Sequence, residues 1–232
     1  MISNISITPI KNMLKNPLNI HNFSFKSHTS TAIIGTNGAG KSTLINTILG
    51  IRYNFKAQNN NIPYHDNVIP QRKQLGVVSN LFNYPPGLNA NDLFKFYQFF
   101  HKNCTPNLFE KNLLNKTYEH LSDGQKQHLK IDLALSHHPQ LIIMDEPETS
   151  LEQNALIRLS NLISLRNTQQ LTSIIATHDP IVLDSCEWVL LLKNGNIAKY
   201  EPLDSILKSV AITFNFKEKP TTKDLLALLK DI

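Results

Sequence analysis

The chain contains the stretch Gly35-Thr36-Asn37-Gly38-Ala39-Gly40-Lys41-Ser42, which matches the pattern G-x-x-x-x-G-K-[ST] in full. The apolar run before it predicts a short buried strand over 30–34, and the residues after it predict a helix over about 41–49. Glycines in such a turn let backbone N–H groups curl around an anion, and the start of a helix adds a partial positive charge. Because a chance match in an ordinary turn would not be framed by this strand and helix, the stretch predicts a site for the phosphates of a nucleotide.

Two side chains of this loop have distinct expected roles. Lys41 can reach the β- and γ-phosphates, and the Ser42 hydroxyl can bind Mg²⁺. The predicted nucleotide-binding residues of the loop are Gly35, Thr36, Asn37, Gly38, Ala39, Gly40, Lys41, Ser42 and Thr43. ATP and Mg²⁺ are therefore the expected ligands.

The segments around the loop alternate between strands and helices. Further strands are predicted over 75–78, 141–145, 173–177 and 188–193, and helices over about 122–136, 151–164 and 222–229. This alternation predicts an α/β fold with a mainly parallel sheet covered by helices. Asn194-Gly195 is a hairpin turn signal and predicts an antiparallel portion that continues over 197–200. The polar stretch 52–72 predicts loops and edge structure.

A second acidic motif follows the predicted strand 141–145. Its apolar body, Leu141-Ile142-Ile143-Met144, leads into Asp145 and Glu146, so the strand delivers both acids to the carboxyl edge of the sheet, where ligands bind in such folds. Asp145 is the expected metal ligand, and Glu146 is the expected general base for the attacking water. Two surface acids at a strand end would explain the pair equally well without the phosphate loop; beside that loop, the catalytic interpretation is favoured.

The stretch Leu121-Ser122-Asp123-Gly124-Gln125 separates this chain from many other P-loop NTPases. It resembles the LSGGQ signature of ATP-binding-cassette (ABC) ATPases, and Gln125 and Asp145 are 20 positions apart, similar to the spacing in that family. Ser122 with Gln125 also forms an S-x-x-Q capping box, so a well-capped helix start is predicted by the residues themselves. The resemblance implies that Ser122, Gly124 and Gln125 contact the γ-phosphate held by a second ABC subunit in a homo- or heterodimer.

The resemblance extends from about Phe25 to Tyr200 and assigns two more site residues. His178 stands where the family has its switch histidine and is expected to contact the γ-phosphate and help position Glu146. Asn80 stands where the Q-loop glutamine is usual, and its shorter amide is expected to contact both nucleotide and metal. Asp123 replaces the first signature glycine, and Glu152 replaces the D-loop aspartate. No aromatic residue upstream of the phosphate loop is a convincing partner for adenine.

The stretch about 83–137 interrupts the alternation and predicts a helical lobe inserted into the P-loop NTPase core, within a single ABC domain spanning 1–232. Asn89 with Asp92 resembles a capping box at the start of a helix. That helix carries Leu93, Phe96, Tyr97 and Phe100 at helical spacing. These apolar residues can pack in the core of the lobe or form a groove for a coupling helix of a membrane subunit, and both can hold on different faces.

Composition limits the classes of function. No apolar run approaches the ~20 residues that span a bilayer, and no signal peptide is recognisable. Two cysteines are too few for a disulfide framework and favour a reducing cytosol. The net charge of +5 comes from scattered Lys and Arg, so no nucleic-acid partner is expected.

The resemblance predicts an ATP-hydrolysing subunit that dimerises on ATP and powers a membrane transporter through its permease subunits, at the cytoplasmic face of the cell membrane. The alternative is a soluble ABC ATPase that acts on a protein complex, such as iron–sulfur cluster assembly. Gln125 weighs against that relative, which usually has Glu there.

Overall fold

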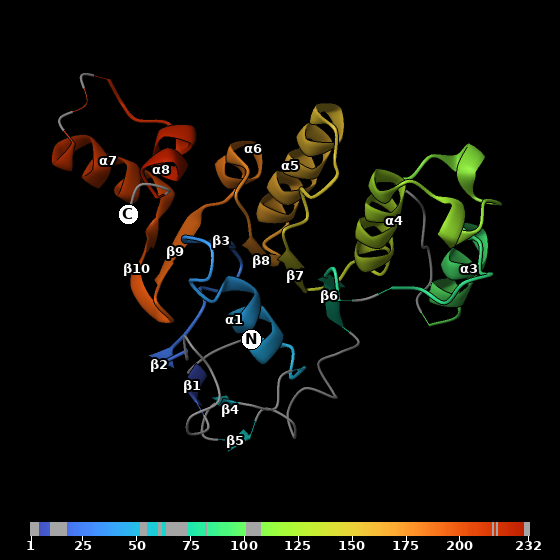
Figure 1. Cartoon of the computed structure of the whole chain (residues 1–232), viewed down its shortest axis with the longest axis horizontal. Helices are drawn as coiled ribbons and strands as arrows, with labels where there is room; N and C mark the ends of the chain where they lie inside the picture. Colours follow the sequence, from blue (N-terminus) through green and yellow to red (C-terminus); the bar gives the residue numbers. More distant parts are fainter. Residues whose placement is uncertain are drawn as a thin grey trace.

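The computed structural model describes residues 5–9, 18–51, 55–59, 62–63, 74–81, 83–100, 108–214, 216 and 218–229, with the backbone alone at 5–9, 55–59, 62–63 and 100. Two sheets and the helices around them make up the described part (Figure 1).

The larger sheet is built on the strand that precedes the phosphate loop. Its six strands lie in the order β10-β9-β3-β8-β7-β6. They are β3 (Ser30–Ile34), β6 (Leu75–Val78), β7 (Leu141–Asp145), β8 (Thr172–Ala176), β9 (Trp188–Lys193) and β10 (Asn196–Pro202). Five are mutually parallel and β10 pairs antiparallel with β9, so the predicted mainly parallel sheet with an antiparallel portion is confirmed. Asn194 and Gly195 have positive φ in the turn between β9 and β10, as the hairpin signal predicts.

A smaller antiparallel sheet has the order β2-β1-β4-β5. Its strands are β1 (Ile5–Pro9), β2 (Ile20–Phe23), β4 (Phe55–Asn59) and β5 (Ile62–Pro63). Loops and edge structure were expected over 52–72, and within this stretch the structure has the two short strands β4 and β5, with β5 at the edge of the sheet. Residues 52–54, 60–61 and 64–72 of that stretch lie outside the described residues.

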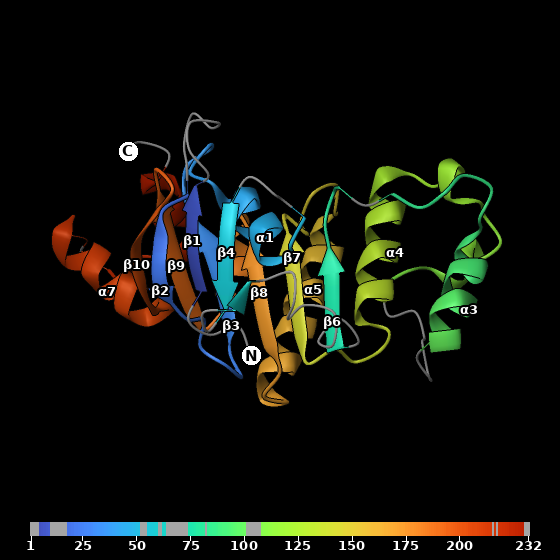
Figure 2. The same cartoon turned by 90° about the horizontal axis from the view of Figure 1, so that it is seen from below.

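Helices cover both faces of the larger sheet. Helix α1 (Lys41–Ile48) lies between the two sheets (Figures 1 and 2), and its Leu44, Ile45 and Ile48 belong to one buried cluster with Ile33 and Ile143. On the other face lie α5 (Gln153–Thr168), α6 (Pro180–Asp184), α7 (Leu203–Thr213) and α8 (Thr222–Leu228), which share a second buried cluster with the strands. The helix predicted over 151–164 thus begins and ends later, and α6 and α7 are helices that the sequence did not predict.

The segment between β6 and β7 contains α3 (Ala90–Phe100), two short 3-10 turns, η2 (Lys111–Leu113) and η3 (Tyr118–His120), and α4 (Asp123–Leu135). We call this segment the helical lobe; it lies beyond β6 at one end of the larger sheet (Figure 2). Helix α4 joins the lobe to the sheet, because Leu129 and Leu133 pack in the lobe's own cluster whereas Ile131, Ala134 and Leu135 pack against the strands.

Helix α3 has one buried and one exposed apolar face. Leu93 and Phe94 are buried, whereas Phe96 and Phe99 are 61% and 84% exposed. Of the two expected environments, Leu93 lies in the packed core of the lobe and Phe96 lies on the exposed face. Phe94, which the spacing did not single out, packs beside Phe109. Asn89 and Asp92 form the expected reciprocal cap at the start of this helix.

Stability tests the packing of α5 on the sheet. Leu159 is fully buried in the second cluster, so Leu159→Ala should lower the free energy of unfolding by about 2–5 kcal/mol, because a cavity replaces packed methyl groups. Ile157 on the same helix is 45% exposed, and Ile157→Ala should change it by about 0.5 kcal/mol or less. Urea denaturation measures both; equal losses would contradict the burial of α5.

Candidate active site

The phosphate loop connects β3 to α1 and is shaped by its glycines. Gly38 and Gly40 have φ of 80° and 105°, the left-handed region in which residues with a Cβ are strained. Gly35 approaches the next strand so closely that a Cβ there would collide with the carbonyl oxygen of Leu192 on β9. The loop is also tied to the β9–β10 hairpin, since the Gly195 N–H donates to the Ala39 carbonyl oxygen at 3.0 Å. The sequence pattern thus produces a fixed turn at the carboxyl end of β3.

Lys41 is the buried cation of this loop. Its side chain is 6% exposed, and Nζ donates to the carbonyl oxygens of Gly35 at 3.0 Å and Thr36 at 3.2 Å. Burial lowers the pKa of this ammonium, while the charges of Glu146, Asp145 and Glu148 act in the opposite direction. The ammonium therefore lies between the loop and a group of carboxylates.

Asp145 and Ser42 meet although 103 positions separate them. The Ser42 hydroxyl donates to Asp145 Oδ1 at 3.1 Å. Burial raises the pKa of the Asp145 carboxyl, and the hydrogen bond from Ser42 partly opposes this. A hydroxyl and a carboxylate oxygen at one point are the kind of hard oxygen ligands that Mg²⁺ prefers.

Glu146 and His178 face each other at the ends of neighbouring strands. Glu146 follows β7 with φ of 48°, an uncommon conformation for a residue with a Cβ, and its N–H donates to the Ala176 carbonyl oxygen of β8 at 2.9 Å. His178 follows β8, and its Nε2 lies 3.6 Å from Glu146 Oε1. The structure thus brings the expected base and the expected histidine together.

The signature stretch opens α4 with the predicted capping box. The Ser122 hydroxyl accepts from the Gln125 N–H at 3.2 Å, and Gln125 Oε1 accepts from the Ser122 N–H at 3.0 Å. Gly124 packs on the turn after β7, where a Cβ would lie 2.8 Å from the Ser150 carbonyl oxygen. On the same helix, Gln127 Nε2 donates to the Pro147 carbonyl oxygen at 2.9 Å.

The order of the strands separates this signature from the phosphate loop of its own chain. Helix α4 packs against β6, and β8 and β7 lie between β6 and β3. At the usual strand spacing, β6 is roughly 14 Å from β3. Figures 1 and 2 both show α4 on the far side of β6 from α1. Ser122 therefore does not share a site with Lys41 and Ser42 within one chain.

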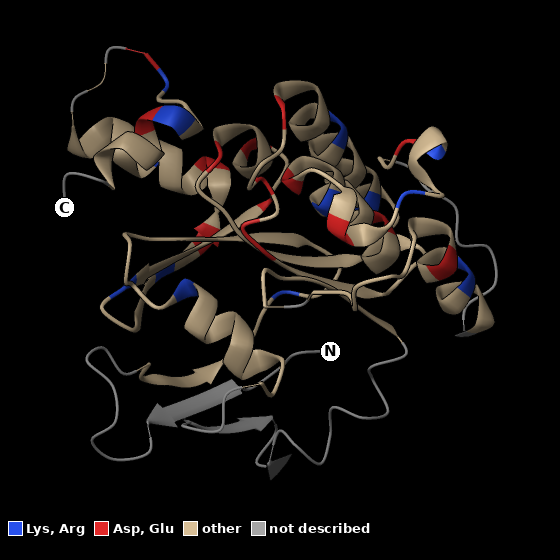
Figure 3. Cartoon of the chain, turned by 45° about the vertical axis from the view of Figure 1, so that its right-hand side comes forward, with Lys and Arg blue, Asp and Glu red and all other residues tan. Residues whose placement is uncertain are grey.

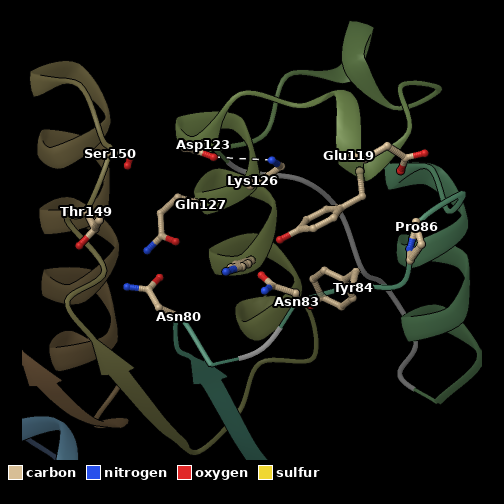
Figure 4. Close-up of a pocket in the computed structure, with 12 residues that line it drawn as sticks. Asn80, Asn83, Tyr84, Pro86, Glu119, Asp123, Lys126, Gln127, Thr149 and Ser150 are labelled. Carbon is tan, nitrogen blue, oxygen red and sulfur yellow. Dashed lines mark ion pairs between the residues drawn. The ribbon is translucent and has the colours of Figure 1, made fainter.

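Asn80 lies in the turn after β6 and lines a pocket of about 460 Å³ between that turn and the helical lobe (Figure 4). Tyr84, Gln127, Thr149 and Ser150 are among the other lining residues. Among the described residues, no hydrogen bond joins Asn80 to Ser42 or Asp145.

Three residues that contact the site were not predicted from the sequence: Glu148, Thr177 and Gln127. Glu148 Oε1 accepts hydrogen bonds from the Thr177 hydroxyl and the His178 N–H. These contacts span about 30 positions, and nothing in the local pattern signals them. Figure 3 shows acidic residues along the upper edge of the larger sheet, while Lys and Arg of the described part are spread over several elements.

A parallel sheet that carries a phosphate loop, two acids and a histidine at its strand ends defines a P-loop ATPase. Comparison with known proteins narrows this class. A family model described as ABC transporter matches residues 18–149, more than half of the chain, and the chain therefore belongs to this family of ATP-binding proteins.

Individual relatives agree with this assignment. The ABC transporter ATP-binding protein YxdL of Bacillus subtilis (strain 168) is 30% identical over 194 residues, which cover 75% of this chain and 76% of that protein. The energy-coupling factor transporter ATP-binding protein EcfA of Malacoplasma penetrans (strain HF-2) is 28% identical over 219 residues, covering 85% and 74%. The fold resembles a dimeric ATP-binding cassette in a post-hydrolysis state bound to ADP and Pi, with a TM-score of 0.70 and 23% identity over 86% of this chain and 98% of that one. The protein is an ATP-binding ABC subunit and an ATPase.

In the part of the chain that the structure describes, no helix is both long and apolar enough to cross a bilayer.

Nucleotide affinity tests the role of Lys41. Lys41→Ala should raise the dissociation constant for ATP about tenfold or more, because a charge-assisted bond to phosphate contributes roughly 1.5–3 kcal/mol. Isothermal titration measures the constant. Lys208→Ala, which removes an exposed lysine on α7, is the matched control and should leave it unchanged. An unchanged constant for Lys41→Ala would refute the phosphate contact.

Proposed function

We propose that this protein hydrolyses ATP between two ABC subunits and thereby drives a membrane transporter. One observation supports this most directly: Lys41, Ser42 and the carboxylates gather at one end of the strands, whereas Ser122 lies beyond β6 on α4. A second subunit that brings its own Ser122 over this phosphate loop would complete the site. Ser122, Gly124 and Gln125 are proposed to contact the γ-phosphate held by the partner.

The hydrolytic roles follow from the chemistry of each side chain. Glu146 acts as general base on the attacking water, and His178, whose Nε2 is 3.6 Å away, helps to position it beside the γ-phosphate. The loop from Gly35 to Thr43 holds the phosphates through backbone N–H groups and the Lys41 ammonium. When bound, Mg²⁺ would neutralise phosphate charge; Ser42 and Asp145 would hold it, and Asn80 is the remaining proposed ligand.

ATP binding and hydrolysis are proposed to switch the dimer between closed and open states. Since a closed dimer holds each nucleotide from two sides, ATP binds that state more tightly and shifts the population toward it. Loss of the γ-phosphate removes the contact with the signature and reopens the dimer. The helical lobes move with this cycle, because α4 carries both the signature and the contacts to the sheet.

A permease subunit is the proposed receiver of this motion. The pocket beside Asn80 is large enough for part of a helix and is rimmed by residues of both the lobe and the turn after β6, such as Asn83, Tyr84 and Tyr118. A segment bound there would be displaced by any movement of the helical lobe relative to the larger sheet. The subunit would accordingly sit at the cytoplasmic face of the membrane, with residues 1–232 forming a single ABC domain.

Dimer trapping tests the composite site. Glu146→Gln keeps the shape of the side chain but removes the base, so it should bind ATP, hydrolyse it at least about a hundredfold more slowly and accumulate as a dimer in size-exclusion chromatography. Adding Ser122→Arg should abolish this dimer and leave the affinity of the monomer for ATP intact. If Ser122→Arg instead abolished ATP binding in a folded monomer, assignment of Ser122 to the partner's nucleotide would be wrong.

Coupling to a permease is tested at the pocket. Asn83 is exposed and lines it, so Asn83→Arg should block a docked segment without touching the nucleotide. Wild-type chain co-expressed with multi-span membrane proteins encoded by neighbouring genes should co-purify with them, and Asn83→Arg should lose this while retaining basal ATPase activity. Wild-type chain that stays in a complex with non-membrane proteins would favour the alternative of a soluble ABC ATPase.

A further inference from the structure

Glu148 is a partly buried acid that none of the roles above uses. It lies in the turn after β7, between Pro147 and Thr149. Oε1 accepts two hydrogen bonds, at 2.8 Å from the Thr177 hydroxyl and 2.7 Å from the His178 N–H. Oε2 is buried and has no hydrogen-bond partner among the residues that the structure describes. Burying a carboxylate carries a desolvation penalty, and in this case it raises the pKa of the group. An apolar residue would fill the same space without that penalty. The presence of a carboxylate therefore indicates a role for its acceptor oxygen beyond packing.

The two hydrogen bonds fix the backbone around the histidine. The Thr177 hydroxyl that donates to Glu148 also accepts from the Asp179 N–H at 3.0 Å. Asp179 in turn caps α6 by accepting from the N–H groups of Ile181 and Val182. Glu148 therefore holds the segment 177–179 at two points, the hydroxyl of Thr177 and the backbone N–H of His178.

The same turn holds the expected base. The Glu146 N–H donates to the Ala176 carbonyl oxygen, and the Glu146 carbonyl oxygen accepts from the Thr149 N–H at 3.1 Å. Glu146 and Glu148 are thus part of one short turn that is bonded to the end of β8 at two points. The backbone hydrogen bond fixes the position of the Glu146 main chain relative to β8. The Glu148 side chain fixes the position of the His178 main chain relative to the same turn.

We propose that Glu148 is a positioning residue that sets the His178 imidazole against Glu146 during ATP hydrolysis. It does so through its hydrogen-bond acceptor Oε1. The proposal rests on the roles given to Glu146 and His178 above. It requires no contact between Glu148 and the nucleotide, so its effect belongs to turnover and not to binding.

Substitutions that separate acceptor, charge and packing test this proposal. Glu148→Leu removes the acceptor and keeps the volume; it should lower kcat about ten- to hundredfold, as small misplacements of catalytic groups do, with the ATP dissociation constant of the monomer unchanged. Glu148→Gln keeps an acceptor oxygen without the charge and should restore most of the lost kcat. Thr177→Val keeps the shape, removes one of the two bonds to Glu148 together with the acceptor of the Asp179 N–H, and should lower kcat less than Glu148→Leu does. In the double variant the two losses should not add, because they break the same contact.

A control separates positioning from stability. Arg166 is a buried polar residue whose guanidinium bonds Ser173 and Thr172 on β8, away from the turn. Arg166→Met should lower the melting temperature but leave kcat as in the wild type. The proposal is overturned if folded Glu148→Leu keeps the wild-type kcat, if Gln restores nothing, or if Arg166→Met loses kcat in parallel with its melting temperature. Should Glu148→Leu not fold, Thr177→Val decides alone: a wild-type kcat overturns the proposal. Failure of the proposed function is recognised separately, by full hydrolysis in Glu146→Gln.

Discussion

Backbone pairing between β7 and β8 places Asp145 opposite Ala176, and the arrangement of the site depends on this register. Parallel strands end at the same edge of a sheet, so residues just after β3, β7 and β8 become neighbours whatever their distance along the chain. The Ser42–Asp145 contact and the approach of His178 to Glu146 both follow from it. A shift of one residue in the pairing register of β7 would turn Asp145 toward the opposite face of the sheet, and both contacts would be lost.

Charge is concentrated and buried at that edge. Burial disfavours the charged forms of Lys41, Asp145 and Glu148 alike, so it lowers the pKa of the lysine and raises the pKa of both acids. The negative charges of the nearby carboxylates act in the opposite direction on the pKa of Lys41. In a poorly solvated place each charge acts more strongly on its neighbours than it would in water. Such a cluster suits a ligand that brings several charges of both signs, as a nucleotide with its metal ion does.

The sequence predicted the parts of the fold that have strong local signals. Each of the strands β3, β7, β8 and β9 contains an unbroken run of three or more apolar residues. Asn194-Gly195 marks the hairpin, and Ser122-x-x-Gln125 marks the helix cap. The antiparallel strands β1, β2 and β4 lack such runs, and they form because a neighbour offers hydrogen bonds. On α3, spacing alone could not decide between Phe94 and Phe96, because five of the seven residues from 94 to 100 are aromatic.

The same limit applies to the site. Motifs predicted Lys41, Ser42, Asp145, Glu146 and His178, which the structure brings together. Glu148 could not be recognised, because its partners Thr177 and His178 lie about 30 positions away. For Asn80 the motif gave an expected role, and the structure places this residue in the turn after β6, on the wall of the pocket beside the helical lobe.

The contact between α4 and the turn after β7 has a mechanical consequence. Gln127 donates a hydrogen bond to the Pro147 carbonyl oxygen, and Gly124 packs closely against the Ser150 backbone. Helix α4, which begins with the signature, is therefore attached to the turn that begins with Glu146. A rotation of the lobe about α4 therefore moves this turn as well, unless the Gln127 hydrogen bond breaks. Since Pro147 follows Glu146 directly, a displacement of the outer helices reaches the backbone next to the proposed general base.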